Sequence, residues 1–247
     1  MTADPLIAHL RRTTRELNDR AGVRDHLEAL ERVIYSAVAT VPGACAAGLT
    51  VADDRYLDFV RATDIAVVGK LDTLQRELDE GPASVVLNAC PEDGIATADD
   101  LAGEDAERWP TFAAHAVDAG HRSMISVLLE VDGGPRAALN LYGTGPDTFD
   151  AYARRAAGVL GLTAGMLLLA AENAEQLQKA LDSRDVIGRA KGVLMERFDL
   201  DQNGAFAMLR EASQETNMKL VDVARWVDEE RAATGGEGQA RGLLRSA

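Results

Sequence analysis

Cysteine and histidine are scarce in this chain of 247 residues, which has two cysteines and four histidines. Cys45 and Cys90 form no CxxC pair, and no two histidines stand at a spacing typical of metal ligands. The histidines are His9, His26, His115 and His121. The sequence therefore indicates neither a disulfide framework nor a metal site, it identifies no cofactor, and we expect both cysteines to behave as small apolar residues.

Basic residues are also in short supply. The chain has 26 Lys and Arg against 40 Asp and Glu, and its formal net charge is -14. A protein that coats nucleic acid without sequence preference neutralises phosphates with many cations, so this class of protein is excluded. Any role with nucleic acid must then depend on a local and specific surface.

A long apolar run is missing too. The longest, Ala156 to Ala171, is shorter than the roughly 20 residues that a membrane span requires, and residues 1–20 lack the apolar core of a signal peptide. With 47% hydrophobic residues, the chain has enough apolar surface for one medium domain and a smaller one. We expect a cytoplasmic protein with no membrane partner.

Motifs of common enzyme classes are absent from the sequence. It contains no HExxH, no GxSxG nucleophile elbow and no GxxxxGK[ST] phosphate loop, and its histidines are isolated. We therefore expect a protein that is not an enzyme.

In the first 143 residues, the spacing of hydrophobic residues alternates between that of a helix and that of a strand. Asp132-Gly133-Gly134 supplies the positive φ angles of a tight hairpin turn. The predicted elements are helices over 6–40 and 70–80, strand-like runs over 44–51 and 56–63, and hairpin strands over 123–131 and 136–143. This order predicts an α+β fold, with helices flanking an antiparallel sheet.

Part of this region resembles a known family. LQRELDEGPASVVLNA, RWPTFAAHAVDAGHRSMISVLLEV and AALNLYGTGPDTFD are similar to a GAF domain of the actinobacterial type, which would cover residues 21–171 and leave 1–20 as an N-terminal helical segment. The resemblance implies a signal-sensing fold with a pocket for an unknown small molecule. Candidate lining residues are Gln75, Trp109, Arg122 and Ser123. The alternative is a structural role for each of them.

A long helical pattern begins at Asp150 and contains a mostly apolar stripe with three-four spacing. The stripe includes Leu160, Leu167, Ala170, Ala174, Leu177 and Leu181. Such a stripe predicts a coiled-coil seam with a second copy, and therefore a homodimer. The alternative is that its first half packs on the sheet, although the stripe continues into the polar stretch 171–182.

The stretch SRDVIGRAKGVLMERF, residues 183–198, has helical spacing but carries two glycines beside cations. Each glycine costs roughly 1 kcal/mol relative to alanine inside a helix, so Gly188 and Gly192 require a reason. Either another helix packs tightly against them, or the backbone of an anionic ligand reaches the helix while Arg184 and Lys191 meet its charge.

Two more helices are predicted after this stretch. Asp201 can cap a helix over 202–215, and Asn217 can start another, which together with 183–198 closes a three-helix bundle. Residues 233–247 lack a sustained pattern and are expected to be disordered.

The bundle also resembles a known family. LQKALDSRDVIGRAKGVLMERF, GAFAMLREAS and NMKLVDVARWV are similar to the ANTAR domain, which we place at 172–232. The resemblance implies an RNA-binding module of transcription antiterminators that recognises tandem short RNA hairpins, usually as a dimer, with RNA rather than DNA as its partner. The implied RNA-binding residues are Arg184, Lys191 and Arg210, the adjacent Gly188 and Gly192, and more weakly Arg189, Arg197 and Lys219.

Residues 175–230 contain eight Lys and Arg against twelve Asp and Glu. We therefore expect RNA affinity to depend on a few contacts and to fall only gently with salt. Phe198, Phe206 and Trp226 are the aromatic residues of this region and are expected in its core, which favours recognition of the RNA loop by arginine and backbone.

Taken together, the two resemblances predict a signal-responsive, RNA-binding regulator of transcription antitermination. The alternative is a protein-interaction or dimerisation module whose cations form surface ion pairs and do not bind RNA.

Overall fold

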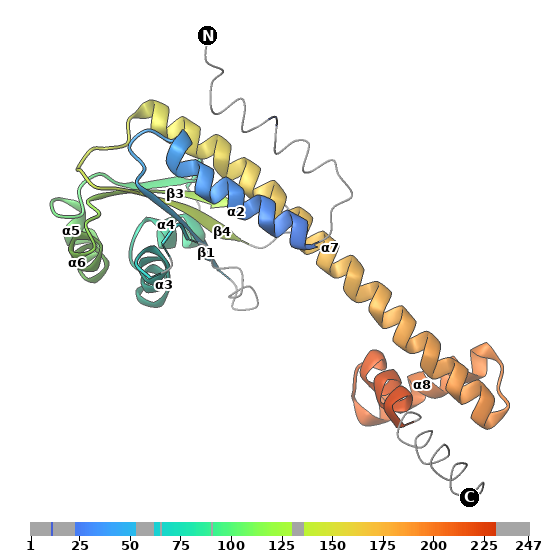
Figure 1. Ribbon diagram of the computed structural model, residues 1–247. Coiled ribbons are helices and arrows are strands. Elements are labelled where there is room, and N and C mark those ends of the chain that lie inside the picture. The colour runs from blue at the N-terminus through green and yellow to red at the C-terminus, as the bar shows by residue number, and fades with distance from the viewer. Residues whose placement is uncertain are drawn as a thin grey trace, which may run out of the picture. The chain divides into compact units, whose positions relative to one another are not determined.

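A computed structural model describes residue 11 and residues 23–52, 62–64, 66–89, 91–129 and 136–230 (Figure 1). The chain divides into two compact units, Met1–Glu175 and Gln176–Ala247. The division falls four residues beyond the predicted domain boundary between 171 and 172. Most of the predicted N-terminal segment and the whole predicted tail, 233–247, lie outside the described residues.

The first unit is built on a four-stranded antiparallel sheet with strand order β1-β4-β3-β2. The predicted hairpin of β3 with β4 is confirmed, since Ser123 pairs with Gly143 and Leu129 with Ala137. Its turn lies outside the described residues, as does most of the predicted strand 56–63, of which Ala62 forms a bridge to Gly48. The strands are β1 (Ala46–Val51), β2 (Ile95–Ala98), β3 (Ser123–Leu129) and β4 (Ala137–Gly143).

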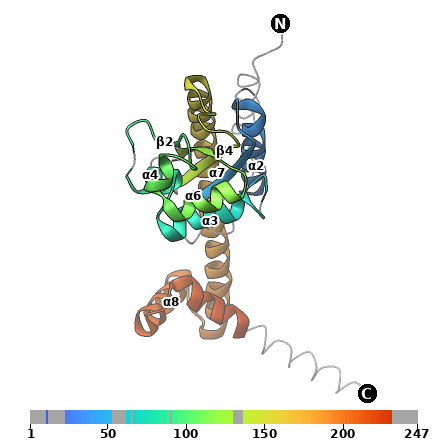
Figure 2. The ribbon, with the colours of Figure 1, turned by 90° about the vertical axis from the view of Figure 1, so that its left-hand side faces the viewer.

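Helices cover both faces of this sheet, as Figures 1 and 2 show. One face packs against α2 (Val23–Thr40) and the first part of α7 (Ala151–Phe198). The other carries α3 (Val68–Leu78), α4 (Pro82–Asn88), α5 (Asp105–Arg108) and α6 (Pro110–Asp118). Because both faces are covered, β1 and β4 are buried along their whole length, and they read in the sequence as nearly continuous apolar runs.

The connection between α3 and α4 depends on a glycine in the left-handed region. Gly81 has φ 95°, and a Cβ there would lie 2.4 Å from the Gln75 side-chain oxygen. Pro82 then begins α4 with its φ already suited to a helix. This agrees with the sequence, in which Gly81 and Pro82 mark a helix end.

The stripe on α7 requires a correction to the predicted dimer seam. Leu160 and Leu167 are fully buried in the core between α2, α7 and the sheet, so they cannot line a seam with a second copy. For these two residues the alternative holds, namely that the first half of the stripe packs on the sheet. By length and composition α7 could also cross a membrane, but 56% of its most apolar window is buried inside the protein, as in a core helix.

The second unit is a bundle of the last part of α7, α8 (Gln202–Thr216) and a helix over residues 220–230. The predicted cap is confirmed, because Asp201 Oδ1 accepts a hydrogen bond from the Gly204 backbone N–H at 2.7 Å. Asn217 does not begin the last helix. It ends α8 in the left-handed conformation, with φ 53°. The core consists of Ala190, Leu194, Ala205, Leu209, Val223 and Ala224.

Candidate nucleic-acid interface

One side of α7 is cationic and bare in the second unit. Arg184, Gly188 and Lys191 follow one another at steps of three or four residues, so they share a side of the helix. A Cβ added to Gly188 or Gly192 would meet no atom within 4 Å. Tight packing against another helix of the described chain therefore does not explain the glycines, and the space beside them is open to an external molecule.

The adjacent surface of α8 continues this side. The ammonium of Lys191 lies 6.0 Å from the centre of the Phe206 ring, which brings the two helices together at this point. Arg210 stands four residues beyond Phe206 and so occupies the same side of α8. Within the described chain, Arg184 and Arg210 are exposed and form no ion pair. We call Arg184, Gly188, Lys191, Gly192, Phe206 and Arg210 the α7–α8 surface.

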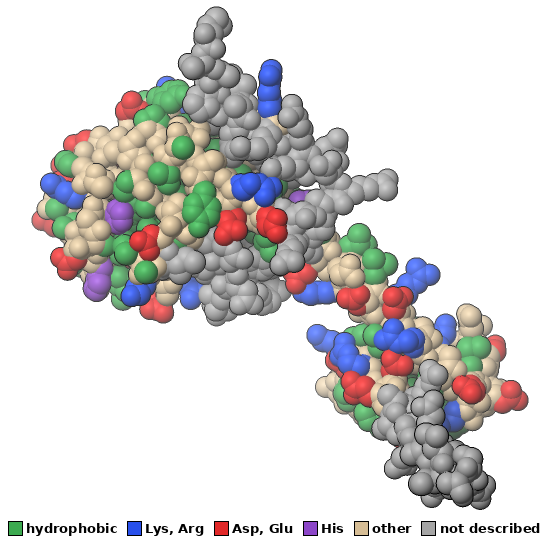
Figure 3. Space-filling model, in the orientation of Figure 1, with side chains coloured by type: hydrophobic (Ala, Val, Ile, Leu, Met, Phe, Trp, Pro, Cys, Tyr) green, Lys and Arg blue, Asp and Glu red, His purple; other side chains and the backbone are tan. Residues whose placement is uncertain are grey.

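Carboxylates border only one edge of the α7–α8 surface. Asp185 and Glu196 lie about a third of a turn or more around α7 from Lys191, but they stand three or four residues from Gly188 and Gly192 and so flank the glycines; Glu211 lies more than a third of a turn from Phe206 around α8. Basic and acidic side chains of the unit are intermingled on the face shown in Figure 3. The helical repeat thus places Arg184 and Lys191 together on the edge of the α7–α8 surface that faces α8, in a domain with negative net charge.

Two of the weaker candidates have partners on the last helix. The Arg189 guanidinium donates to Asp228 at 2.8 Å, and Arg197 lies 3.7 Å from Glu230. The hydrogen bond to Asp228 raises the pKa of Arg189. Both arginines tie α7 to the last helix, on the side of α7 away from Lys191. Lys219 is exposed just before that helix and is not grouped with the α7–α8 surface by any contact described here.

The prediction that the three aromatic residues lie in the core is wrong. Phe198, Phe206 and Trp226 are 51%, 41% and 60% exposed. The physical reason is the content of the core, where Ala190, Ala205 and Ala224 allow the helices to approach closely and leave no volume for a ring.

Comparison with known proteins identifies the second unit. The sequence model of the ANTAR domain family matches residues 175–227, and the first unit has the antiparallel sheet with flanking helices of the GAF-like fold. Residues 175–227 form an ANTAR domain. The ANTAR resemblance predicted from the sequence is thus confirmed, and for the first unit the predicted α+β fold is confirmed. An ANTAR domain implies RNA binding in antitermination, and GAF and ANTAR domains are regulatory, non-catalytic domains.

Solved structures resemble this chain in fold alone. The Stigmatella aurantiaca phytochrome photosensory core module matches with TM-score 0.51 and 14% identity over 87% of this chain and 45% of that one. A bacteriophytochrome of R. palustris matches with TM-score 0.50 and 12% identity over 87% and 47%. The GAF domain of an Acinetobacter phosphoenolpyruvate-protein phosphotransferase gives TM-score 0.43 and 13% identity over 68% and 94%.

The chain thus spans less than half the length of the two phytochrome structures that it matches. No curated protein matches the sequence.

In the GAF-like domain, two of the four predicted pocket residues, Gln75 and Arg122, make contacts within the fold. Gln75 is fully buried, donates to the Tyr142 hydroxyl at 3.2 Å and accepts from the Ala83 backbone N–H at 3.0 Å. Trp109 and Ser123 are buried, and Arg122 forms a two-pronged ion pair with Asp100. None of the four lines the cavity beside β1 and α3 or the groove beside α7, and the predicted ligand pocket stays a prediction.

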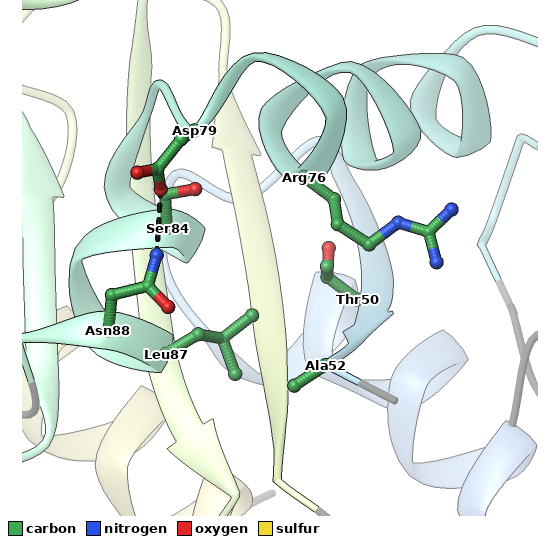
Figure 4. A pocket seen from close by; sticks show the side chains of 7 residues that line it. All are labelled: Thr50, Ala52, Arg76, Asp79, Ser84, Leu87 and Asn88. Carbon is green, nitrogen blue, oxygen red and sulfur yellow. Dashed lines mark hydrogen bonds between the residues drawn. The ribbon is translucent and has the colours of Figure 1, made fainter. Parts of the chain in front are cut away.

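A cavity of about 200 Å³ does lie between β1, α3 and α4 (Figure 4). At one end the Asn88 amide donates to Asp79 at 2.7 Å, and Thr50 connects the cavity to the interior because its hydroxyl accepts from the Asn140 amide at 2.8 Å. The lining residues are Thr50, Ala52, Arg76, Asp79, Ser84, Leu87 and Asn88. Sequence reasoning missed them because the strand and helices that align them are far apart in the chain.

Behind this cavity lies a buried polar network centred on Asp72. One carboxylate oxygen accepts from the Tyr142 hydroxyl at 2.6 Å and from the Asn140 amide at 2.8 Å, while the other has no hydrogen-bond partner. Burial raises the pKa of Asp72 to about 7, and the two hydrogen bonds counteract part of that shift. The network joins α3 to β4, and its carboxyl occupies the space that a side chain at Gly48 would require.

Proposed function

We propose that this chain is a GAF-ANTAR protein, a signal-responsive regulator of transcription antitermination that binds tandem RNA hairpins through the α7–α8 surface. The observation that carries the proposal is the open space over Gly188 and Gly192, beside Arg184 and Lys191. The two glycines destabilise α7, and no described part of the chain packs closely against them.

RNA suits this surface because its backbone is both anionic and able to lie against a bare helix. Lys191, Arg184 and Arg210 can each meet a phosphate, and the missing Cβ atoms let the sugar-phosphate chain approach the helix backbone. Because only three cations would contact phosphates, RNA affinity should fall only gently as the salt concentration rises. RNA affinity would therefore depend on these three side chains and not on the overall charge of the domain, which is negative.

A homodimer would hold two hairpins at once, and α7 presents a second stripe for it. Leu162 and Met166 are 69% and 52% exposed on the side of α7 opposite Leu160, and Leu177 is also exposed at heptad-like spacing. An open groove of about 820 Å³ continues the stripe and is bordered by Val159 and Leu162. We place the dimer contact on this stripe, with Leu177 and Leu181 of the predicted seam at its C-terminal end.

The GAF-like domain would supply the response to a signal. Its cavity of about 200 Å³ accommodates a small ligand, and Thr50 connects the cavity to the buried network around Asp72. A ligand shifts the protein only if it binds two states with different affinity. Helix α7 contributes to the cores of both domains, so a change in its packing in one domain would reach the other. When the protein binds one hairpin, the RNA would then be unable to fold into a competing terminator. We infer a cytoplasmic protein without catalytic activity.

The first prediction is a titration of the full chain against a fluorescein-labelled RNA of two short hairpins, followed by anisotropy. We expect the two-hairpin RNA to bind at least tenfold more tightly than a single hairpin. Lys191→Ala and Arg184→Ala each remove one phosphate contact, so each should weaken binding severalfold and reduce the salt slope by about one.

Arg225→Ala is the matched control, because Arg225 is exposed on the last helix and paired with Asp222 at 2.8 Å. It should leave RNA binding unchanged. If the wild-type chain does not bind the two-hairpin RNA, or if both cation variants bind as well as wild type, the RNA interface lies elsewhere or the chain is an interaction module.

A further inference from the structure

Phe206 lies on the α7–α8 surface next to Lys191, although the sequence predicts a buried aromatic residue at this position. Its ring is 41% exposed, the ammonium of Lys191 is 6.0 Å from the ring centre, and Arg210 lies one turn away along α8. Single exposed apolar residues are common on protein surfaces and need no explanation. The composition of the surroundings distinguishes Phe206, since an exposed ring beside two cations suits an unpaired base, which is flat, and the phosphates attached to it.

The other two exposed aromatic residues of the domain lack this setting. Trp226 shares its helix with carboxylates on neighbouring turns, Asp222 before it and Glu229 and Glu230 after it. Phe198 is the last residue of α7 and is followed by Asp199 and Asp201. Phosphates would be repelled in both places.

We propose that Phe206 is the stacking platform for one unpaired base of an RNA hairpin loop, with Lys191 and Arg210 contacting the phosphates on either side of that nucleotide. Unpaired loop bases are the parts of RNA that proteins usually read, and a base that stacks on an aromatic ring contributes to affinity whatever its identity. This inference rests on the proposed function and adds an aromatic contact to a surface otherwise composed of cations and backbone.

The test combines substitutions at Phe206 with abasic RNA. Phe206→Ala and Phe206→Leu both remove the aromatic face, and each should weaken binding to the two-hairpin RNA by about 5- to 100-fold, the range for one lost base stack. Phe206→Trp keeps an aromatic face and should restore binding. Trp226→Ala is the matched control for loss of an exposed aromatic residue and should bind normally.

Abasic substitutions placed one at a time in the loops identify the base. One abasic RNA should bind wild type more weakly by the same factor, and it should bind Phe206→Ala with no further loss. Because the ring is partly exposed, helicity and chain association should be unchanged in all variants.

The inference is overturned if Phe206→Leu binds like wild type, if every abasic RNA loses the same additional factor with Phe206→Ala, or if Phe206→Ala changes the mass of the assembly. Normal binding by Phe206→Ala together with weak binding by Lys191→Ala would overturn the stack and leave the proposed function in place. A wild-type chain that fails to bind the two-hairpin RNA would overturn both.

Discussion

At the scale of single residues, substitutions at Gly188 and Gly192 should change protein stability and RNA affinity in opposite directions. Alanine fits at either position because no atom lies within 4 Å of the added Cβ, and it should stabilise α7 by roughly 0.5–1 kcal/mol. The same methyl group would hold an RNA backbone away from the helix. We therefore expect each Gly→Ala variant to raise the midpoint of unfolding in urea and to weaken RNA binding at least severalfold.

Gly158→Ala is the control for this prediction, since it makes the same change in α7 within the GAF-like domain, where the new Cβ would meet Ile95 at an ordinary 3.5 Å. It should not alter RNA affinity in the same titration. RNA binding that survives in both Gly188→Ala and Gly192→Ala would show that RNA does not approach this part of the helix.

Asp72 gives a prediction of pH dependence. Its folded-state pKa of about 7 lies above the ordinary value of 3.8, so the folded protein holds the proton more tightly than the unfolded chain does. The free energy of unfolding should therefore fall as pH rises from about 4 to about 7, by roughly 4 kcal/mol in total at about 1.4 kcal/mol per pH unit. Above pH 7 this contribution should be constant.

Asp72→Asn resembles the neutral carboxyl in shape and should remove this slope. Urea unfolding of both chains at intervals between pH 4.5 and 8 measures the difference, in which contributions from other titrating groups such as His121 cancel. Parallel curves for the two chains would mean that the carboxyl at position 72 does not titrate in this range.

At the scale of elements, the sequence predicts the parts with a strong local signal. The β3–β4 hairpin has a turn sequence between two apolar strands, and the Asp201 cap stands directly before a periodic run; both are present. Strand β2 has four residues and helix α5 also has four, which is too short for either period to be recognised. Their places are fixed by pairing with β3 and by packing rather than by local pattern.

The seam on α7 shows a second limit of sequence reasoning. Between Ala156 and Ala171 the helix is apolar almost all round, so three-four stripes can be drawn on more than one side. Packing of α7 against the sheet determines that Leu160 and Leu167 face inward and that Leu162 and Met166 face outward. Likewise, Gln75 has the chemistry of a pocket residue, but it is buried and hydrogen-bonded inside the fold.

In the second unit, the cations and glycines of the candidate site could be found from the helical repeat alone, whereas Phe206 could not. An aromatic residue at the edge of an apolar stripe is assigned to the core by default. The small size of Ala190, Ala205 and Ala224 is the signal that contradicts this default, because helices packed through alanine leave large rings outside.

At the scale of the whole molecule, the proposal that two chains cooperate to hold two hairpins depends on the outer stripe of α7. Leu162→Glu combined with Met166→Glu places two charges on it, and the fold should remain intact because both side chains are exposed. We expect wild type to have twice the chain mass of 26.4 kDa in light scattering, and the double variant to have the mass of one chain.

RNA binding should change in a specific way with this loss of assembly. The double variant should bind a single hairpin as wild type does, because the α7–α8 surface is untouched, but it should lose the tenfold or greater preference for two hairpins, which comes from the effective concentration of the second site. Leu78→Glu, at the end of α3, is the control for an exposed leucine outside the stripe and should leave mass and preference unchanged. A double variant that stays a dimer would place the contact between copies on another surface, and a monomer that still prefers two hairpins would mean that one chain contacts both.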